Sequence, residues 1–452
     1  MWIFITLVTA ITVNVNDKAA VKQLNKLAAQ RLNSFYTTSG EGRTADGKGC
    51  LRQHRADNDP TSFNWYECGV FWGALMDYSE ISGDTQFLNT ITNSVTLASY
   101  GKVGSFLGPD KTVSEVLHGV WNDDIMWWSL VPLAGARRFG IDQTMPGGIG
   151  YFQLAKNTYN EVFQLWTDEC DGGIYWSRYR NSPKDNERYS KSAITNAQHL
   201  YSGSVLYSLT GDKTFLANSY KMFDWIAQKL VLSDYMTADG ISVKSKLGDC
   251  TISIPKEGKP GVFTSHSYIP GTIVGAMATF YGVSKNTTHL SLAENIAKKA
   301  LNQFQTNGII TDYCDPNCDV TSVNPKGTYL RGLGILYQKT QDQKLKDLIK
   351  NTVQKSTTAM LNTCDSNMKC NSASWAKPQI LENNIHVAMN NLELLNTLSI
   401  ILNGVNDDKL APPTQPPPAA PVADIDANPT GGAAQNSFYI VSVFVLLATL
   451  IN

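Results

Sequence analysis

The sequence carries no surplus of charge of either sign. Its 38 Lys and Arg residues almost balance 39 Asp and Glu residues, which gives a net charge of −1 and a pI near 6.6. A protein that grips nucleic acid through its phosphates needs a basic surface, usually with a pI above about 9. The balance of charge excludes a general nucleic-acid binder, and we expect no nucleic-acid partner.

Stretches in which apolar and polar residues alternate over the length of a strand are also missing. Between residues 17 and 405, apolar residues recur instead at helical spacing. This spacing predicts twelve helices, over residues 18–36, 64–81, 85–100, 120–139, 149–166, 192–209, 213–230, 267–281, 288–305, 326–338, 343–360 and 381–402. The sequence therefore predicts one all-α domain over residues 17–405.

A weak internal repeat pairs these helices into hairpins. Ser82-Gly83-Asp84 and Thr210-Gly211-Asp212 each follow one helix and precede the next, and two further turns, at 285–287 and 340–342, stand in the same frame. Glycine or a polar residue ends one helix, and an Asp or Asn side chain caps the next. Six such hairpins closed in a circle predict an (α/α)6 toroid or barrel, with an open helical solenoid as the alternative.

Neither end of the chain has the features of an ordinary membrane span. Residues 1–16 begin with a short apolar run and contain the small-residue sequence Val8-Thr9-Ala10, which predicts a secretory signal peptide. The apolar run 438–451 is only 14 residues long, follows small residues and is not followed by Lys or Arg. We therefore expect residues 431–452 to be a GPI-anchor signal that is removed on maturation, with a single-pass or tail-anchored protein as the alternative.

Residues 406–430 between the domain and this signal form a proline-rich stalk. Such a segment is extended and semi-rigid, so it would hold the domain away from a membrane. Together these signals predict a secreted protein at the cell surface, attached to the outer face of the plasma membrane through a lipid anchor only.

Histidine is scarce, and none stands at zinc-ligand spacing near the close pairs Cys314/Cys318 and Cys364/Cys370. An even number of cysteines, eight, is typical of an oxidising compartment. We expect at least one bridge to join the first pair to the second, because such a staple would hold the ring closed. Asn286 lies in the sequon Asn-Thr-Thr, which predicts a glycan there.

The stretch 121–128, with sequence WNDDIMWW, places two adjacent carboxylates among three tryptophans. Burying such charge is costly unless it is paired or used. Glycoside cleavage usually needs two carboxylates, and aromatic rings stack on the apolar faces of sugars. Asp123 and Asp124 are therefore candidate catalytic residues. The alternative is a helix cap with a first-turn acid that stabilises the helix dipole.

In a toroid, the N-terminal ends of the inner helices would ring one mouth. Aromatic and polar residues gather at these ends, and polar groups there would select among sugar hydroxyls. The tryptophans of 121–128 lie on different sides of one helix, so one or two of them would be core. The candidate substrate-binding residues are Trp65, Glu67, Trp121, Asn122, Trp128, Trp176, Asn196 and His266.

With these motifs in view, the chain resembles glycoside hydrolase family 76, the endo-α-1,6-mannanases, and within it the GPI-anchored fungal branch of cell-wall assembly. The resemblance spans most of residues 32–402. It rests on residues 65–78 (WYECGVFWGALMDY), 121–128 (WNDDIMWW), 172–176 (GGIYW), 191–200 (KSAITNAQHL) and 326–333 (KGTYLRGL). The chain departs from the family pattern at Lys191-Ser192, where relatives often have Lys-Asn.

The resemblance implies an (α/α)6 barrel and a retaining mechanism with Asp123 as nucleophile and Asp124 as general acid/base. It requires no metal and no cofactor. The expected activity is that of a mannan endo-1,6-α-mannosidase in cell-wall assembly or remodelling, with α-1,6-mannan or the mannose of a GPI glycan as substrate. One alternative is a transglycosidase that moves GPI-linked mannoproteins onto a wall glucan as acceptor. Another is a non-catalytic wall protein that binds mannan.

Overall fold

The computed structural model describes residues 13–39, 44–52, 63–99, 104–106, 120–244, 249–253, 266–318, 325–381 and 383–404. The predicted stalk and GPI-anchor signal, and residues 1–12 of the predicted signal peptide, lie outside these residues.

The described residues form the twelve predicted helices and one short additional helix, α6. The helices are α1 (Lys18–Asn33), α2 (Trp65–Ser82), α3 (Leu88–Ala98), α4 (Asn122–Phe139), α5 (Tyr151–Phe163), α6 (Asp185–Tyr189), α7 (Ala193–Thr210), α8 (Lys213–Lys229), α9 (Tyr268–Ser284), α10 (Thr287–Gln303), α11 (Pro325–Lys339), α12 (Gln343–Leu361) and α13 (Ile385–Asn403). The all-α prediction is confirmed.

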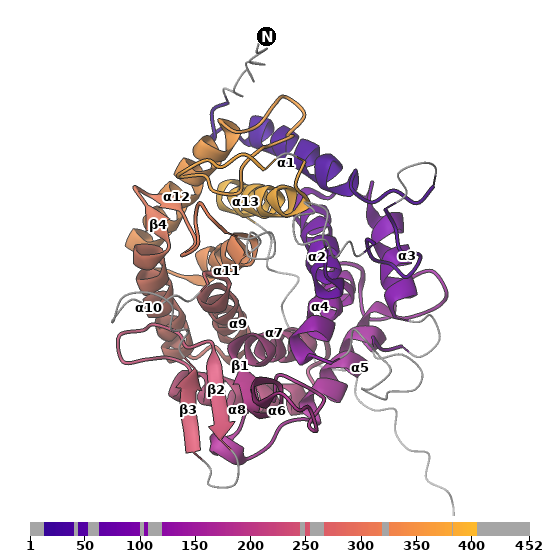
Figure 1. Cartoon of the computed structure of the whole chain (residues 1–452), viewed down its shortest axis with the longest axis vertical. Helices are drawn as coiled ribbons and strands as arrows, with labels where there is room; N and C mark the ends of the chain where they lie inside the picture. The colour runs from indigo at the N-terminus through magenta and orange to yellow at the C-terminus, as the bar shows by residue number, and fades with distance from the viewer. Residues whose placement is uncertain are drawn as a thin grey trace, which may run out of the picture. The chain divides into compact units, whose positions relative to one another are not determined.

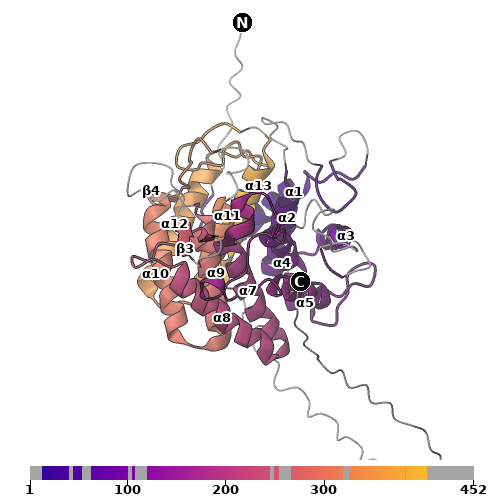
Figure 2. The same cartoon turned by 60° about the horizontal axis from the view of Figure 1, so that its bottom comes forward.

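The long helices are arranged as two concentric rings, which Figure 1 shows along the ring axis. The inner ring runs α2, α4, α7, α9, α11, α13, and α13 packs against α2, so the ring is closed. The outer helices cover the seams, and Figure 2 shows α8, α10 and α12 outside α7, α9 and α11. The first helix, α1, packs on the last, α13. Closure confirms the (α/α)6 barrel and rules out the open solenoid.

Helix α13 has the length and apolarity of a membrane span, yet it belongs to the inner ring. Of its apolar 18-residue window, 89% is buried inside the protein. A helix that is apolar on all sides is expected where neighbours surround it completely. Its composition therefore reflects its place between α11, α2, α1 and α12.

The hairpin turns use the predicted chemistry. Gly83 and Gly211 have φ angles of 76° and 70°, and their N–H groups donate to the carbonyls of Ser79 and Tyr207. The left-handed conformation costs glycine little because it has no Cβ. In the corresponding turn after α9, Lys285 adopts this conformation with φ 55°. The reversal at each turn makes all six inner helices run in the same direction.

Helix starts are capped by the residues that follow these turns. Asp212 accepts a hydrogen bond from the backbone N–H of Thr214, and Asp342 accepts one from Leu345. Asn286 caps α10 in the same way through its Oδ1 atom. Its glycosylation stays a prediction.

Inner helices approach one another closely where glycines meet. A Cβ atom on Gly332 of α11 would lie 2.0 Å from the carbonyl oxygen of Gly271 on α9. A Cβ on Gly69 of α2 would lie 2.7 Å from the backbone nitrogen of Trp128 on α4. These contacts explain why the inner helices are rich in small residues.

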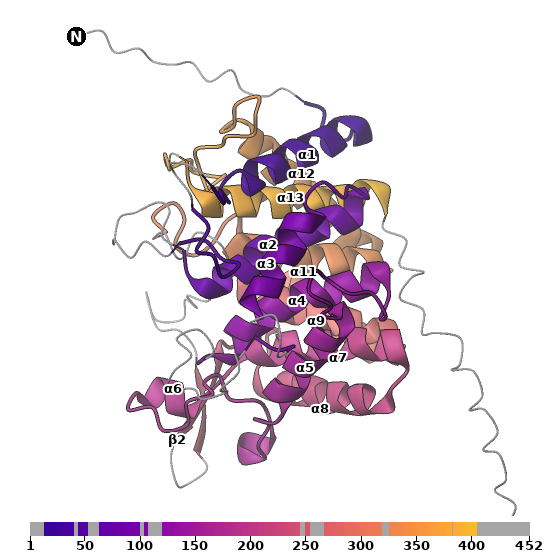
Figure 3. The ribbon, with the colours of Figure 1, turned by 90° about the vertical axis from the view of Figure 1, so that its right-hand side faces the viewer.

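Short strands decorate one end of the ring. β1 (Ser190–Ser192), β2 (Gly240–Lys244) and β3 (Asp249–Ser253) form an antiparallel sheet, and β4 (Gln305–Thr306) pairs with β5 (Ile309–Ile310). β1 leads directly into α7. Figure 3 shows β2 and α6 on the side where the inner helices begin. We call this side the front mouth and the side where the inner helices end the rear mouth.

All eight cysteines are oxidised, but one predicted pairing is wrong. The bridges are Cys50–Cys68, Cys170–Cys250, Cys314–Cys318 and Cys364–Cys370. The last two close within single turns because each pair is separated by only 4 or 6 residues, and an antiparallel bridge joins the backbones of Cys364 and Cys370. The expected staple between these two pairs does not form. The bridge of longest range joins Cys170 to Cys250 across 80 residues.

Candidate active site

The two adjacent acids lie in the first turn of α4, at the front mouth. Trp121 is the N-cap residue, and Asp123 and Asp124 follow in the first helical turn. Free backbone N–H groups and the helix dipole favour negative charge at such a position. The indole Nε1–H of Trp176 donates a hydrogen bond of 2.8 Å to Oδ1 of Asp123.

The electrostatic surroundings give the two carboxyls different pKa values. Burial raises the pKa of Asp123 to about 7, although hydrogen bonds from Trp176 and from backbone N–H groups oppose the rise. Burial raises the pKa of Asp124 well above its usual range, and the charges of Asp123 and Glu67 raise it further. A helix N-terminus by itself favours the ionised form of Asp123. The structure places the pKa of Asp123 near neutrality because burial outweighs the helix terminus, while Asp124 holds its proton to higher pH.

Trp176 reaches Asp123 from a loop that is fixed on both sides. The backbone N–H of Trp176 donates to the carbonyl of Ser190 in β1, and its carbonyl accepts from the N–H of Asn122. The rings of Trp121 and Trp176 stack with centroids 5.6 Å apart. These contacts place both indoles beside the acids, as expected for a surface that receives a sugar ring.

Asn122 and Asn196 do not take the predicted role of binding sugar hydroxyls. Both are fully buried. The amide of Asn122 donates to the carbonyl of Tyr175. The amide of Asn196 accepts from the N–H of Ile174 and donates to the carbonyls of Ile174 and Ser192. Their amides hold the Trp176 loop, so the prediction is corrected from substrate contact to loop support.

Trp65, Trp128 and Glu67 are likewise interior residues. The indole of Trp128 donates to the carbonyl of Trp65, and their rings pack with centroids 5.5 Å apart. Glu67 is fully buried, and its Oε1 lies 2.8 Å from Nε2 of His386 on α13. Because these side chains are almost or completely buried, we do not count them among the proposed substrate contacts. Glu67 acts on the site through its charge, which raises the pKa of Asp124.

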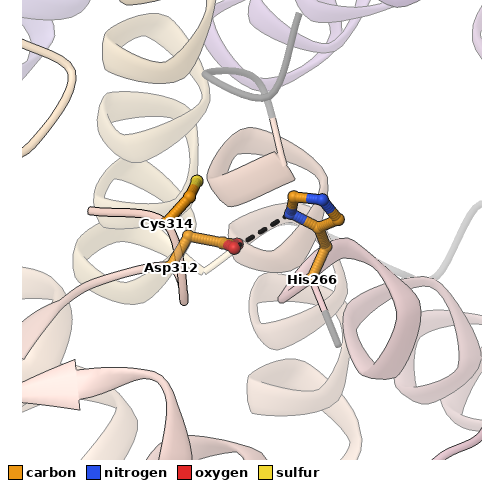
Figure 4. Close-up of side chains that lie close together, drawn as sticks. All are labelled: His266, Asp312 and Cys314. Carbon is orange, nitrogen blue, oxygen red and sulfur yellow. Dashed lines mark hydrogen bonds and ion pairs between the residues drawn. The ribbon is translucent and has the colours of Figure 1, made fainter. Parts of the chain in front are cut away.

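His266 stands at the front mouth and is oriented by Asp312, as Figure 4 shows. Its Nδ1 lies 3.0 Å from Oδ1 of Asp312, while Oδ2 accepts from the N–H and hydroxyl of Ser267. Burial raises the pKa of Asp312, but these hydrogen bonds bring it below its usual range. His266 also stacks on Tyr268, with ring centroids 5.6 Å apart.

Potential metal-ligand atoms of His266, Asp312 and Cys314 lie within 4.8 Å of one another (Figure 4). The sulfur of Cys314 is bonded to Cys318, so it offers no thiolate. The Asp312 carboxylate already accepts hydrogen bonds on both oxygens. The donor chemistry of this cluster therefore fits a hydrogen-bonded support for His266 better than a metal site.

Three residues near the acids were not among the predicted site residues. The pKa of Tyr66 and that of Tyr268 are raised well above the usual range, first by burial and then by carboxylates that include Asp123. Tyr66 and Tyr268 occupy the first turns of inner helices α2 and α9, so the positional rule that pointed to Asp123 could have included them. Burial raises the pKa of Asp239, which precedes β2, and no sequence pattern marks this residue.

Comparisons with known proteins identify the family of this chain. The sequence model of Glycosyl hydrolase family 76 matches residues 20–409. Mannan endo-1,6-alpha-mannosidase DCW1 of Saccharomyces cerevisiae is 22% identical over 342 residues, which cover 73% of this chain and 68% of that protein.

Two solved structures share the fold. Dfg5 from Chaetomium thermophilum, in complex with glucosamine, aligns with a TM-score of 0.70 and 18% identity, over 86% of this chain and 92% of that one. An α-1,6-mannanase of Salegentibacter sp. HEL1_6 aligns with a TM-score of 0.66 and 17% identity, over 84% and 99%. That structure is an inactive variant in which two consecutive aspartates are replaced by asparagine, and it holds α-1,6-mannotriose.

Proposed function

Because this chain belongs to glycosyl hydrolase family 76, we propose that it cleaves α-1,6 linkages between mannose residues, as a mannan endo-1,6-α-mannosidase of cell-wall assembly or remodelling. The observation that carries the proposal is the pair of adjacent carboxyls at the start of α4, one bonded to an indole N–H and the other holding a proton to higher pH. The α-1,6-mannanase variant that lacks two consecutive aspartates and is inactive supports the same assignment.

The proposed reaction is a double displacement. Asp124 donates its proton to the glycosidic oxygen as that bond breaks, while ionised Asp123 attacks the anomeric carbon and forms a glycosyl ester. Asp124, now ionised, takes a proton from water, which attacks the anomeric carbon and displaces Asp123. The product keeps its anomeric configuration. The hydrogen bond from Trp176 to Oδ1 orients the Asp123 carboxylate for this attack.

His266 and the stacked pair Trp121 and Trp176 are the proposed substrate contacts among the predicted residues. Their side chains are partly exposed at the front mouth, and the Trp176 indole, which stacks on that of Trp121, bonds to Asp123. Aromatic faces bind many hexoses, so they contribute affinity, whereas hydrogen-bonding groups such as the His266 imidazole contribute selectivity.

The substrate is tested by comparing kcat/KM on linear α-1,6-mannan oligosaccharides with kcat/KM on β-1,3- and β-1,6-glucan oligosaccharides of equal length. We expect the mannan series to be the better donor and its first-formed products to retain the α configuration by NMR. A glucan donor that is cleaved faster, or products of inverted configuration, would refute the proposal.

The acceptor is tested separately, because either water or a sugar hydroxyl can resolve a glycosyl ester. Product analysis on α-1,6-mannan with and without a glucan acceptor distinguishes hydrolysis from transfer. Free mannan fragments in both reactions indicate the hydrolase. New mannan–glucan conjugates that form only with acceptor indicate the transglycosidase, and binding without either product indicates the mannan-binding protein.

We also propose that the mature protein is held at the outer face of the plasma membrane, or in the wall, after GPI attachment. The short apolar C-terminal run behind small residues supports this localisation. Phosphatidylinositol-specific phospholipase C should release the membrane-bound form, and the mature protein should lack the tail peptide. Persistence of that peptide in the mature protein would overturn the localisation.

A further inference from the structure

Lys191 is a fully buried lysine in β1, behind the front mouth. Its ammonium donates to the carbonyl of Thr167 at 3.3 Å, the hydroxyl of Thr167 at 2.9 Å, and the carbonyls of Glu169 and Gly172 at 2.5 and 2.6 Å. All four acceptors are uncharged. Desolvation of the ammonium is therefore only partly offset, and burial lowers the pKa of Lys191 to about 8.

The acceptors belong to a turn with an uncommon backbone. Cys170 and Asp171 have φ angles of 59° and 58°, and Gly172 and Gly173 have φ angles of 124° and 90°. Non-glycine residues rarely adopt positive φ, and such a conformation persists where its surroundings hold it in place. This sequence of angles turns several carbonyls toward one point, and the Lys191 ammonium occupies that point. We call residues 167–173 the lysine-bound turn.

The chain leaves this turn directly toward the nucleophile. Residues 174–176 follow it, and the indole of Trp176 reaches Oδ1 of Asp123. Lys191 and its neighbour Ser190 hold both ends of this segment. Its side chain binds the turn that precedes the segment, and its neighbour Ser190 accepts the backbone N–H of Trp176 at 2.7 Å. The ammonium also lies 4.9 Å from the centre of the Tyr175 ring.

We propose that Lys191 is a positioning residue for Asp123: by gathering the carbonyls of the lysine-bound turn, it fixes the segment that delivers the Trp176 indole N–H to the carboxylate. Lys191 itself does not touch Asp123. Without its ammonium, three carbonyls and a hydroxyl lose their common donor, the turn relaxes, and Trp176 loses its alignment. The inference rests on the proposed role of Asp123 as nucleophile.

The test is a double-mutant cycle between Lys191→Met and Trp176→Phe, read from the pH dependence of kcat/KM. Methionine keeps the length of the side chain without the charge. Trp176→Phe removes the donor to Asp123, so the pKa of Asp123 rises and the acid limb of the profile moves to higher pH. Since a hydrogen bond to a charged group is strong, we expect a loss in kcat of about 10-fold or more.

Lys191→Met should move the acid limb in the same direction, with a lower kcat and little change in KM. In the Trp176→Phe background, Lys191→Met should move the limb no further, because the bond that it orients is already absent. A folded Lys191→Met protein with an unmoved acid limb would overturn the proposal. So would an equal shift in both backgrounds.

Lys326→Met is the matched control for loss of a buried lysine. Lys326 is also almost fully buried, but it pairs with Asp315 before α11 and does not contact the lysine-bound turn. This variant should lose stability without moving the acid limb of Asp123. If Lys191→Met does not fold, Thr167→Val removes one acceptor, the Oγ1 atom, and should shift the limb in the same direction by a smaller amount.

A readout that needs no substrate separates this proposal from the proposed function. The carboxyl carbon of Asp123 can be titrated by NMR in protein labelled at aspartate, with Asp123→Asn to assign the signal. If wild-type protein cleaves no mannan but Lys191→Met raises this pKa, the proposed function fails and the positioning role stands. If mannan is cleaved and the pKa is unchanged in Lys191→Met, the positioning role fails alone.

Discussion

The front and rear mouths of the ring are built by the same six helices, yet they treat buried acids differently. At the rear, Arg137 pairs with Glu80 on both oxygens, and Arg331 lies between Asp77 and Glu393. At the front, the charges that act on Asp124 are two further carboxylates, Asp123 and Glu67. Rear acids face guanidinium groups, whereas the front pair Asp123 and Asp124 faces an indole N–H, tyrosines and other carboxylates.

The pKa values alone would not separate the two mouths. Burial raises the pKa of Glu393 to about 7, as it does for Asp123. The guanidinium of Arg331 opposes this rise, but Glu393 shares it with Asp77. The identity of the partner makes the distinction. An arginine fixes a carboxylate in a structural pair, while the indole N–H of Trp176 orients Asp123 without neutralising it. A carboxyl with a raised pKa in a cleft therefore indicates catalysis only when its neighbours do not pair with it as a structural cation would.

Removing the front acids should have the largest effect on turnover. Asp123→Asn and Asp124→Asn should each abolish turnover, by at least about 10³-fold, because the amide can neither attack the anomeric carbon nor donate the acid proton. Circular dichroism should show an intact fold, since the substitution is nearly isosteric. Rear-mouth Asp77→Asn is the matched control and should keep turnover within a few fold. Near-wild-type activity of Asp123→Asn would refute the assignment.

Removing a rear cation should instead act on stability. Arg331→Met leaves buried Glu393 and partly exposed Asp77 without their shared guanidinium, and breaking a buried pair costs up to about 3–5 kcal/mol. Urea unfolding measures this loss, and the kcat of the folded fraction should stay close to that of wild type. A catalytic loss with unchanged stability would mean that the rear mouth takes part in the reaction.

The third prediction concerns pH. Activity requires ionised Asp123 and protonated Asp124, so kcat/KM should rise as pH passes through about 7 and fall again at higher pH as Asp124 ionises. A profile with its acid limb near pH 4 would contradict the raised pKa of Asp123. The control is Trp176→Phe, in which the acid limb should move to higher pH.

The contribution of Asp123 and Asp124 to stability should fall as pH rises, whereas kcat/KM should rise through about pH 7. Both carboxyls have raised pKa values in the folded protein, so their folded state favours the proton. The stability that they contribute is complete below about pH 4 and is lost as pH rises through the folded pKa values. The melting temperature of Asp124→Asn minus that of wild type should therefore increase between pH 4 and pH 8. A gap that stays constant over this range would contradict the raised pKa of Asp124.

The smallest effect is expected from a cation of the rear rim. Arg138 follows Arg137 on α4, but it donates to the hydroxyl of Ser79 and lies over the ring of Phe139. Since it is partly exposed, Arg138→Met should change the free energy of unfolding by no more than about 1 kcal/mol and leave kcat unchanged. A loss as large as that of Arg331→Met would show that the rear network extends to its rim.

Sequence reasoning succeeded where structure is decided locally. The turns at Gly83 and Gly211 and the cap at Asp212 depend on adjacent residues, so the hairpins could be predicted from turn chemistry. The adjacent acids were marked by their place among tryptophans, and their catalytic role stays a prediction. The same local logic should have favoured the short-range disulfide Cys314–Cys318, because the ends of a turn are already close.

The sequence could not indicate the role of a polar side chain whose hydrogen-bond partner lies on a distant segment. Asn122 finds its acceptor at Tyr175, 53 residues away, and Glu67 finds His386 319 residues away. No local pattern indicates that such a polar group is turned inward. Asp239 is the converse case, because it has no aromatic neighbours in sequence and reaches the site only through the pairing of β2 with β1.

The common direction of the inner helices also decides where the chain leaves the ring. α13 begins beside the front mouth and ends at Asn403, and its C-cap residue Gly404 lines a cavity of about 740 Å³ at the rear. Its 19 residues span about 28 Å. Gly404, the last residue of the domain that the structure describes, therefore lies on the side of the barrel opposite Asp123.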